Sequence, residues 1–266
     1  MIKAKRFFLA AFCFFLTFQL FPQNEKPFEI SPVKDGIIFG SGILLSGGDL
    51  ILDNALKVNR QEYTGKIYKK SDLNSFDRFF MHSYSESRDN VADFLLAATI
   101  ASPAVLAMTD KEEWFSCALM YAETLLIANG IKELTKLAVN RTRPYMYYDA
   151  DTFPEKDVDD GDWANSFPSG HSTMAFSAAT FTSYTFCKYF PDSNLRIPVV
   201  AGSYAMACGV AALRLSSGNH FMTDVLTGAA IGSAVGFLVP WLHAFNAKND
   251  LNVALRADGI SVAVSF

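Results

Sequence analysis

The chain has 266 residues, enough for one sizeable hydrophobic core or two small ones. Half of the residues are hydrophobic and 19% are charged, which is apolar for a soluble protein but mild for a dense membrane bundle. The formal net charge of −4 argues against general nucleic-acid binding, because that function needs a basic surface.

Residues 1–21 are predicted to be a signal peptide or a signal anchor. Lys3, Lys5 and Arg6 precede a short apolar stretch from Phe7 to Phe21. A basic flank before a short apolar core is typical of a secretory signal. No clean small-x-small cleavage site follows, so cleavage and retention both stay open. In either case the polar stretch that follows is expected outside the cytoplasm.

Residues 22–90 form a predicted polar N-terminal region with one short apolar segment. This segment, Gly36–Gly48, has thirteen residues and is interrupted by glycine and serine. A membrane span needs about 20 mostly apolar residues. We therefore expect the segment to lie at the membrane interface or to pack against the rest of the protein.

Residues 91–247 are predicted to form the helical bundle. Several segments approach the length of a membrane span, although each would also suit a buried helix of a soluble all-α domain. Their many small residues favour close helix packing. We predict an all-α bundle of about five to six apolar helices, embedded in a membrane, with the active site at one end. The segments are Val91–Met108 (interrupted by Asp93), Phe115–Val139, Ser172–Phe190, Ile197–Leu213 and Val225–Ala247.

Residues 248–266 form a C-terminal tail of different character. Apolar residues alternate loosely with polar or small ones, and Asp258-Gly259 is a turn signal. A lone hairpin is marginally stable by itself. The favoured interpretation is therefore a frayed extension.

The number of spans decides on which side of the membrane the site lies. A leader plus five spans places it on the exported, periplasmic face of a bacterial-type inner membrane, which is our prediction. If Gly36–Leu52 also crosses, the site moves to the cytoplasm. The loop Lys57–Asn90, with seven Lys/Arg against five Asp/Glu, favours the cytoplasm under the positive-inside rule.

The first chemical motif is Lys136, followed seven residues later by Arg143-Pro144. Seven residues are two helical turns, so both cations can lie on one helix face, and Pro144 then ends the helix. A guanidinium can bind two phosphate oxygens at once, and a lysine adds a point charge. Alone, the motif is equally typical of a solvated basic helix end.

The second motif is Pro168-Ser169-Gly170-His171, directly before an apolar run. Backbone N–H groups at the start of a helix can bind an anion, and His171 is placed there to protonate a leaving oxygen. Alone, the motif is more typical of an ordinary capped helix start with a surface histidine.

The third motif contains Arg214, His220 and Asp224. His220 and Asp224 are four residues apart, on one helix face. A carboxylate that accepts from one ring nitrogen leaves the other nitrogen nucleophilic. A capping pair beside a buried helix is the alternative. Arg214 would be a third phosphate ligand.

Together the motifs resemble the three-part signature of type 2 phosphatidic acid phosphatases, a superfamily that includes class A acid phosphatases and vanadium haloperoxidases. The resemblance covers roughly residues 90–245. It departs at Leu213, where the family usually has serine. The spacing of the first motif is the phosphatase form.

The resemblance implies a metal-free phosphatase in a helical bundle, with the site at the bilayer surface. His220 would form a phosphohistidine, Asp224 would orient it, and His171 would act as general acid and then activate water. The groups that would bind phosphate are Lys136, Arg143, Ser169, Gly170 and Arg214.

We therefore predict hydrolysis of a phosphomonoester or pyrophosphate of a membrane lipid, with no cofactor, no metal and no nucleic-acid partner. The sequence leaves the head group and the oligomeric state open. Two alternatives stay open: a soluble exported acid phosphatase of broad specificity, and a membrane protein that binds phosphate without turnover.

Overall fold

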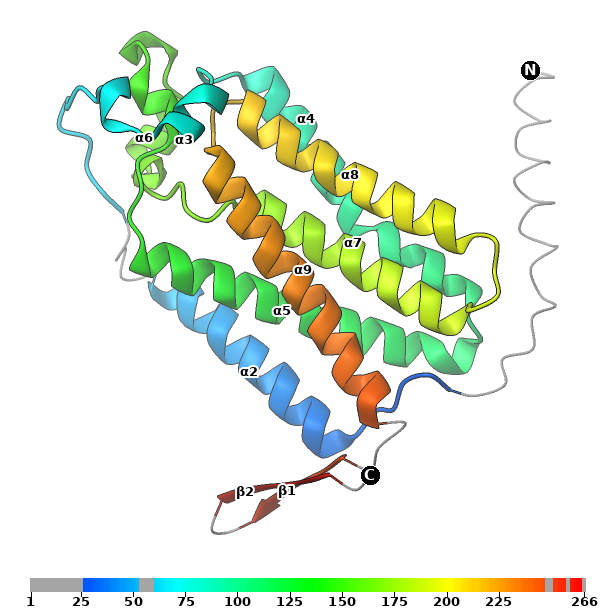
Figure 1. Ribbon diagram of the computed structural model, residues 1–266. Helices are drawn as coiled ribbons and strands as arrows, with labels where there is room; N and C mark the ends of the chain where they lie inside the picture. Colours follow the sequence, from blue (N-terminus) through cyan, green and yellow to red (C-terminus); the bar gives the residue numbers. More distant parts are fainter. Residues whose placement is uncertain (1–25, 53–59, 247–250, 257–258, 265–266) are drawn as a thin grey trace, which may run out of the picture.

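The computed structural model describes residues 26–52, 60–246, 251–256 and 259–264, so the predicted leader lies outside the described residues. Six long helices of the described part lie side by side and form the bundle (Figure 1). The predicted all-α bundle of five to six helices is confirmed. These helices are α2 (Pro32–Leu50), α4 (Glu86–Ile100), α5 (Trp114–Ala138), α7 (Gly170–Tyr189), α8 (Arg196–Ser216) and α9 (Met222–Asn246).

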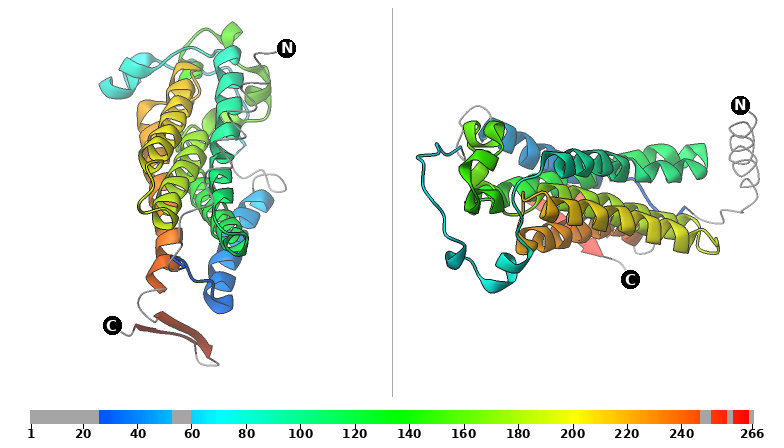
Figure 2. Two further views of the ribbon diagram at one scale, coloured as in Figure 1. Left: turned by 90° about the vertical axis from the view of Figure 1, so that its right-hand side faces the viewer. Right: turned by 90° about the horizontal axis from the view of Figure 1, so that it is seen from above.

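Most of the shorter helices gather at one end of the bundle, where α7 and α9 begin and α5 and α8 end. The two views in Figure 2 agree with Figure 1 on this arrangement. We call this end the loop end and the opposite one the far end. The loop end carries η2 (Lys70–Asp72), α3 (Ser75–Phe80), η5 (Pro144–Tyr147), η6 (Ala150–Thr152), α6 (Glu155–Asp159) and η7 (Asp162–Ala164), and the far end carries η3 (Ser102–Met108) and η4 (Lys111–Glu113).

Helix α7 is the centre of the bundle and packs against α4, α5, α8 and α9. Its buried positions are mostly alanine, serine and threonine, and hydroxyls such as that of Ser177 donate to a carbonyl one turn earlier (Ser177 Oγ to Thr173 O, 2.8 Å). Four stretches of the described chain, and not the expected five, are long and apolar enough to cross a membrane. They are Glu86–Met108, Lys111–Ala138, Arg196–Ser216 and Met222–Ala244. The expected span that is missing from these four, Ser172–Phe190, is α7, whose polar side chains are tolerated because other helices enclose it.

Three glycines of α9 allow its backbone to lie directly against α7. A Cβ atom at Gly228 would lie 2.5 Å from the carbonyl oxygen of Ser169, and one at Gly232 would overlap the carbonyl oxygen of Thr173. This four-residue repeat of small residues is typical of close helix pairs in membranes. It also determines how near the start of α7 comes to the start of α9.

The apolar segment Gly36–Gly48 packs against the rest of the protein, which is one of its two expected positions, but it does so as part of a longer helix. It belongs to the nineteen-residue helix α2, roughly 28 Å long at 1.5 Å per residue, which lies along α5. A Cβ atom at Gly42 would lie 2.8 Å from Cβ of Leu126, and Ser46 Oγ donates to the Leu126 carbonyl at 2.7 Å. Two of the residues that interrupt the apolar segment, Gly42 and Ser46, are therefore contacts with α5.

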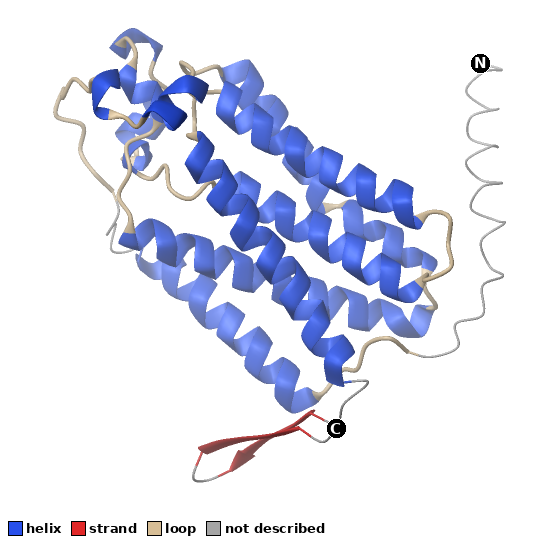
Figure 3. Ribbon diagram, in the orientation of Figure 1, coloured by secondary structure: helices blue, strands red, loops and turns tan. Residues whose placement is uncertain are grey.

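The C-terminal tail also differs from the predicted frayed extension. Strands β1 (Leu251–Arg256) and β2 (Gly259–Val264) form an antiparallel hairpin, drawn in red in Figure 3. Arg256 pairs with Gly259, so the connection is one residue earlier than the predicted Asp258-Gly259 turn.

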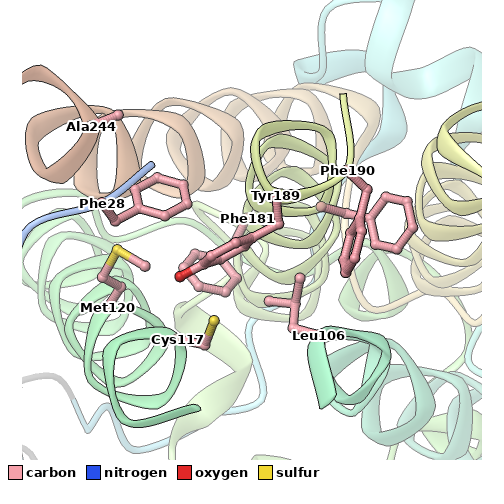
Figure 4. Packing of buried hydrophobic residues seen from close by; sticks show 9 residues of the cluster. Phe28, Leu106, Cys117, Met120, Phe181, Tyr189, Phe190 and Ala244 are labelled. Carbon is pink, nitrogen blue, oxygen red and sulfur yellow. The ribbon is translucent and has the colours of Figure 1, made fainter. Parts of the chain in front are cut away.

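Large apolar side chains fill the far end of the bundle. Figure 4 shows side chains of η3, α5, α7 and α9 packed around Phe181, together with Phe28 from the segment before α2. Other large apolar residues point outwards from the helices, among them Leu44, Phe94 and Ile197. Apolar residues on both the inside and the outside of span-length helices agree with a membrane location.

Candidate active site

The three sequence motifs meet at the loop end. Lys136 lies in the last turn of α5, Ser169 is the N-cap of α7, Arg214 lies in the last turn of α8, and His220 lies just before α9. Four helix ends therefore place the predicted residues around one point, although they are up to 88 positions apart in the chain.

His220 is buried, and its ring is oriented by a backbone carbonyl. Nδ1 lies 2.7 Å from the Ser166 carbonyl oxygen, which can only accept, so Nδ1 carries the proton and Nε2 carries the lone pair. Asp224 Oδ2, the partner predicted from the spacing, is 3.8 Å from Nδ1. The direct hydrogen bond that selects the tautomer is therefore made by Ser166.

Asp224 holds the surroundings of His220 together. Its carboxylate accepts from Ser166 Oγ at 2.6 Å and from the Phe221 backbone N–H at 2.8 Å. Its charge is balanced by an ion pair with Arg141, which also contacts Asp77 of α3 at 2.7 Å. Asp224 therefore orients His220 indirectly, through the Ser166 segment.

Positive charges surround His220. Burial lowers the pKa of His220 well below its ordinary value, and the charges of Arg143, Arg214, His171 and Lys136 lower it further. These four groups come from three separate parts of the chain, and the fold brings them near the same ring. A neutral imidazole among cations can attack an anionic phosphate.

Arg143 is buried and held from two sides. Its Nη2 pairs with the Asp162 carboxylate, its Nε donates to the Asp162 carbonyl at 3.1 Å, and its Nη1 lies 3.3 Å from Asn219 Oδ1. This arrangement keeps the guanidinium in one orientation. Asp162 belongs to the acidic loop between Pro144 and Pro168.

Arg214 has an unsatisfied donor at the site. Its Nη1 pairs with Asp89 of α4, and Asn219 Nδ2 donates to the same carboxylate oxygen at 3.0 Å. Its Nε is buried and has no hydrogen-bond partner in the described part of the chain. A buried orphan donor is costly, and an anionic ligand would satisfy it.

Lys136 is accompanied by a second lysine one turn earlier. Lys136 Nζ lies 3.7 Å from Glu133, which also pairs with Lys132. The stem of Lys132 covers Gly170, where a Cβ atom would lie 3.1 Å from Lys132 Cδ. A side chain at position 170 would therefore push Lys132 away from the start of α7.

The start of α7 presents His171 and free backbone N–H groups. Ser169 caps the helix, since its side chain accepts from the Ser172 N–H, and its own N–H donates to the Asp224 carbonyl at 3.0 Å. His171 Nε2 lies 2.6 Å from Asp93 Oδ1 of α4. In the described part of the chain Nδ1 of His171 has no hydrogen-bond partner, so it can face a substrate.

Two loops that carry the site are joined to each other. Arg141 N–H donates to the Ala164 carbonyl, and Ser166 N–H donates back to the Arg141 carbonyl, both at 2.8 Å. Behind them lies an aromatic cluster that holds the loops on the bundle. It consists of Tyr63, Tyr68, Tyr84, Tyr145, Met146, Tyr147, Phe153, Val158, Trp163 and Ala164.

Comparison with known proteins identifies the family of this part of the chain. The PAP2 superfamily model matches residues 118–248, the part of the chain that contains all three motifs. This part of the chain belongs to the PAP2 superfamily. The predicted resemblance is therefore confirmed.

Curated relatives of the chain include phosphatases of several bacteria. The chain is 28% identical over 161 residues to a lipid A 1-phosphatase of Porphyromonas gingivalis, which covers 60% of this chain and 32% of that protein. It is 36% identical over 77 residues to phosphatidylglycerophosphatase B of Bacillus subtilis, a match that covers 28% of this chain and 37% of that protein. The chain thus spans about a third of the length of these two relatives.

A solved structure is also similar. It is the crystal structure of a transmembrane PAP2-type phosphatidylglycerolphosphate phosphatase from Bacillus subtilis. The two chains superpose with a TM-score of 0.45 and 20% identity, over 79% of this chain and 95% of the other.

Several residues of the PAP2 site lie outside the predicted set. Arg141 is two residues before Arg143, but nothing in the sequence indicates that it faces Asp224. The sequence gives one signal for Asp93, which is that this charged residue interrupts the apolar segment Val91–Met108. Asp89, Asp162 and Lys132 carry no signal, because their partners are 125, 19 and 38 positions away in the chain.

Proposed function

We propose that this chain is a membrane phosphatase that hydrolyses the phosphate ester or pyrophosphate of a lipid through a phosphohistidine at His220. The observation that carries the proposal is that Nδ1 of His220 is held by the Ser166 carbonyl, which leaves the lone pair on Nε2, in a buried ring with Arg143, Arg214 and Lys136 nearby. The names of the relatives, lipid A 1-phosphatase and phosphatidylglycerophosphatase B, support a lipid phosphate as the substrate.

In the first step the Nε2 lone pair of His220 forms a bond to phosphorus while the bond between phosphorus and the lipid oxygen breaks. The positive ring that results keeps its Nδ1 proton on the Ser166 carbonyl. His171 gives a proton to the departing oxygen, so a lipid alcohol leaves from a phosphate ester and a lipid monophosphate leaves from a pyrophosphate.

In the second step His171, now neutral, accepts a proton from water while the water oxygen bonds to phosphorus. The bond between phosphorus and Nε2 breaks, and inorganic phosphate leaves. His220 and His171 return to their starting states, so atoms and protons balance.

Throughout the reaction the fixed cations would bind the equatorial oxygens, where the charge of the transferring phosphoryl group is spread. Arg143 and Arg214 are pre-oriented by Asp162 and Asp89. The orphan Nε of Arg214 would donate to the phosphate. The backbone at Ser169 and Gly170 would add N–H donors at the helix start.

The direct test is to trap the intermediate. The full chain in detergent is mixed with a phosphate-labelled lipid and denatured rapidly at alkaline pH, where a phosphohistidine survives. We expect label on His220 in the wild type and none in His220→Ala. Phosphate release without a labelled protein would contradict the covalent mechanism, and binding without release would identify a phosphate-binding protein.

A panel of lipid phosphates and soluble phosphate esters would then define the substrate. We expect phosphatidylglycerol phosphate, phosphatidic acid, polyprenyl pyrophosphate or lipid A to be hydrolysed faster than soluble esters. Equal rates on soluble esters, with release of the protein from membranes by alkaline carbonate, would identify the soluble exported phosphatase instead.

The proposed location is the inner membrane, with the site on the exported face. With α2 along the bundle, the side of the membrane on which the site lies depends on the side of residues 26–31. Because α2 runs from the far end to the loop end, the site lies across the bundle from residues 26–31. An exported site therefore requires residues 26–31 to be cytoplasmic, which is opposite to the side expected for a stretch that follows a secretory leader. Cysteines introduced at Lys26 and Lys66, labelled with a membrane-impermeant reagent in intact cells, would decide the side.

A further inference from the structure

A second cluster of titratable side chains lies in the interior of the bundle, away from the phosphate site. Asp35 comes from the first turn of α2, Glu123 from the middle of α5, and His243 from the last turns of α9. One ligand atom of each lies within 4.8 Å of the others, and all three residues are buried. His243 is 19 positions after Asp224 on the same helix, roughly 28 Å along its axis.

The ring of His243 is oriented like that of a metal ligand. Nδ1 lies 2.8 Å from the Val239 carbonyl oxygen, so Nδ1 carries the proton. Nε2 then points its lone pair at two carboxylate oxygens, Asp35 Oδ1 at 2.9 Å and Glu123 Oε2 at 3.3 Å. A histidine whose other nitrogen donates to a backbone carbonyl is the usual second-shell arrangement of a metal site.

Glu123 provides an independent observation. It is completely buried, and neither of its carboxylate oxygens has a hydrogen-bond partner in the described part of the chain. The nearest lysine, Lys34, donates to the Glu29 carbonyl at 3.0 Å and lies 4.0 Å from Asp35, so it does not satisfy Glu123. A buried carboxylate persists only when it is paired or binds a cation.

A proton on His243 Nε2 does not explain the cluster as well as a cation does. That proton would point along the 2.9 Å contact to Asp35 Oδ1 and leave both oxygens of Glu123 unsatisfied. A cation between the three residues would contact all of them. Asp35 is already oriented for this, because its other oxygen, Oδ2, accepts from the Ser31 N–H at 2.6 Å.

We propose that Asp35, Glu123 and His243 bind a divalent metal ion that connects α2, α5 and α9. The donor set of one imidazole and two carboxylates suits a first-row ion such as Zn²⁺ or Mn²⁺ better than Ca²⁺, which prefers oxygen ligands alone. The ion would be structural, since the cluster lies about a helix length from His220. It would join α2 to the PAP2 region.

The test uses the full chain, purified in detergent, stripped with a chelator and dialysed against Zn²⁺ or Mn²⁺. We expect about one ion per chain by mass spectrometry of the metal, and a higher thermal unfolding midpoint in the metal-loaded protein. Glu123→Gln keeps the size of the side chain and should lose both the ion and the shift. Glu112→Gln, an exposed glutamate ahead of α5, is the matched control and should keep both.

Two further measurements keep the test decisive. His220→Ala must retain the ion, since loss of the ion there would assign it to the phosphate site and overturn the proposal. If Glu123→Gln does not fold, visible absorption bands of the Co²⁺-loaded wild type report nitrogen and oxygen ligands without any variant. A wild-type protein that holds no metal, and whose unfolding midpoint is unchanged by metal and chelator, would identify a protonated histidine cluster instead.

Discussion

Two buried histidines of this chain are held in the same way but face opposite charges. In His220 and His243 Nδ1 donates to a backbone carbonyl, at 2.7 and 2.8 Å, and Nε2 is left with the lone pair. Around His220 lie cations, whereas around His243 lie Asp35 and Glu123. The first arrangement suits an anionic phosphate and the second suits a metal cation.

The comparison shows that the orientation of a histidine prepares a ligand atom, while the neighbouring charges select the ligand. Near His220 the carboxylates are still present, but each is bound to a cation: Asp224 to Arg141, Asp162 to Arg143 and Asp89 to Arg214. Near His243 the carboxylates outnumber Lys34, and Glu123 has no partner. The five predictions below test the His220 side of this comparison.

The largest effect is expected from His220→Ala. Removal of the nucleophile should lower phosphate release by on the order of 10⁴-fold or more. The thermal unfolding midpoint of the metal-loaded protein should remain close to that of the wild type, which separates chemistry from folding. Substantial residual turnover would show that another group attacks the phosphate.

Arg214→Lys keeps the charge but loses the planar fork and the orphan Nε. Because the donor is fixed and buried, we expect kcat/KM for the lipid phosphate to fall by roughly 10²-fold. Arg196→Lys, at the exposed far end of the same helix, is the matched control and should behave like the wild type. An equal, small effect of both variants would mean that Arg214 acts only through its charge.

Gly232→Ala tests the backbone contact that brings the two halves of the site together. A methyl group at this position would overlap the Thr173 carbonyl, so α7 and α9 must move apart, at a cost of about 1–3 kcal/mol in the free energy of unfolding. Gly202→Ala on α8 has open space and serves as the control. The unfolding midpoint should fall only for position 232, and equal midpoints would contradict the close contact.

Asp93→Asn tests whether this carboxylate positions the acid, His171. The amide keeps an acceptor oxygen for His171 Nε2 but loses the negative charge that stabilises the protonated ring, and we expect kcat to fall by about tenfold while KM changes little. Asp110→Asn, an exposed aspartate at the far end, is the control. A KM effect without a kcat effect would assign Asp93 to substrate binding.

The smallest effect is a shift in pH dependence. Because burial and the surrounding cations lower the pKa of His220, its neutral form persists as the pH falls below about 6.5, the ordinary value for histidine. Arg143→Gln removes one of these charges and raises the pKa of His220, so the acid limb of kcat/KM should move to higher pH. The pH profiles of the wild type and the variant are measured with the same substrate, so that the ionisation of the substrate affects both equally. An acid limb at the same pH in both proteins would contradict the role of the cations.

The sequence alone predicted the residues and the chemistry of the candidate site, and it determined the class of fold. Helical periodicity and apolar length predict the bundle, because they are local patterns that can be read without knowing which segments pack against each other. Lys136, Arg143, His171, Arg214, His220 and Asp224 could be named because their spacing places them near helix ends, next to loops. The family assignment to PAP2 followed from the same residues.

Only the tertiary structure decided which carboxylate binds which cation and which carbonyl holds which histidine. Asp35, Glu123 and His243 show the reason: they are 88 and 120 positions apart in the chain, so no local pattern links them. Their meeting depends on how α2 and α9 pack against α5. The same holds for α2 itself: in the sequence Gly42 interrupts an apolar segment, but in the structure it allows close contact with α5.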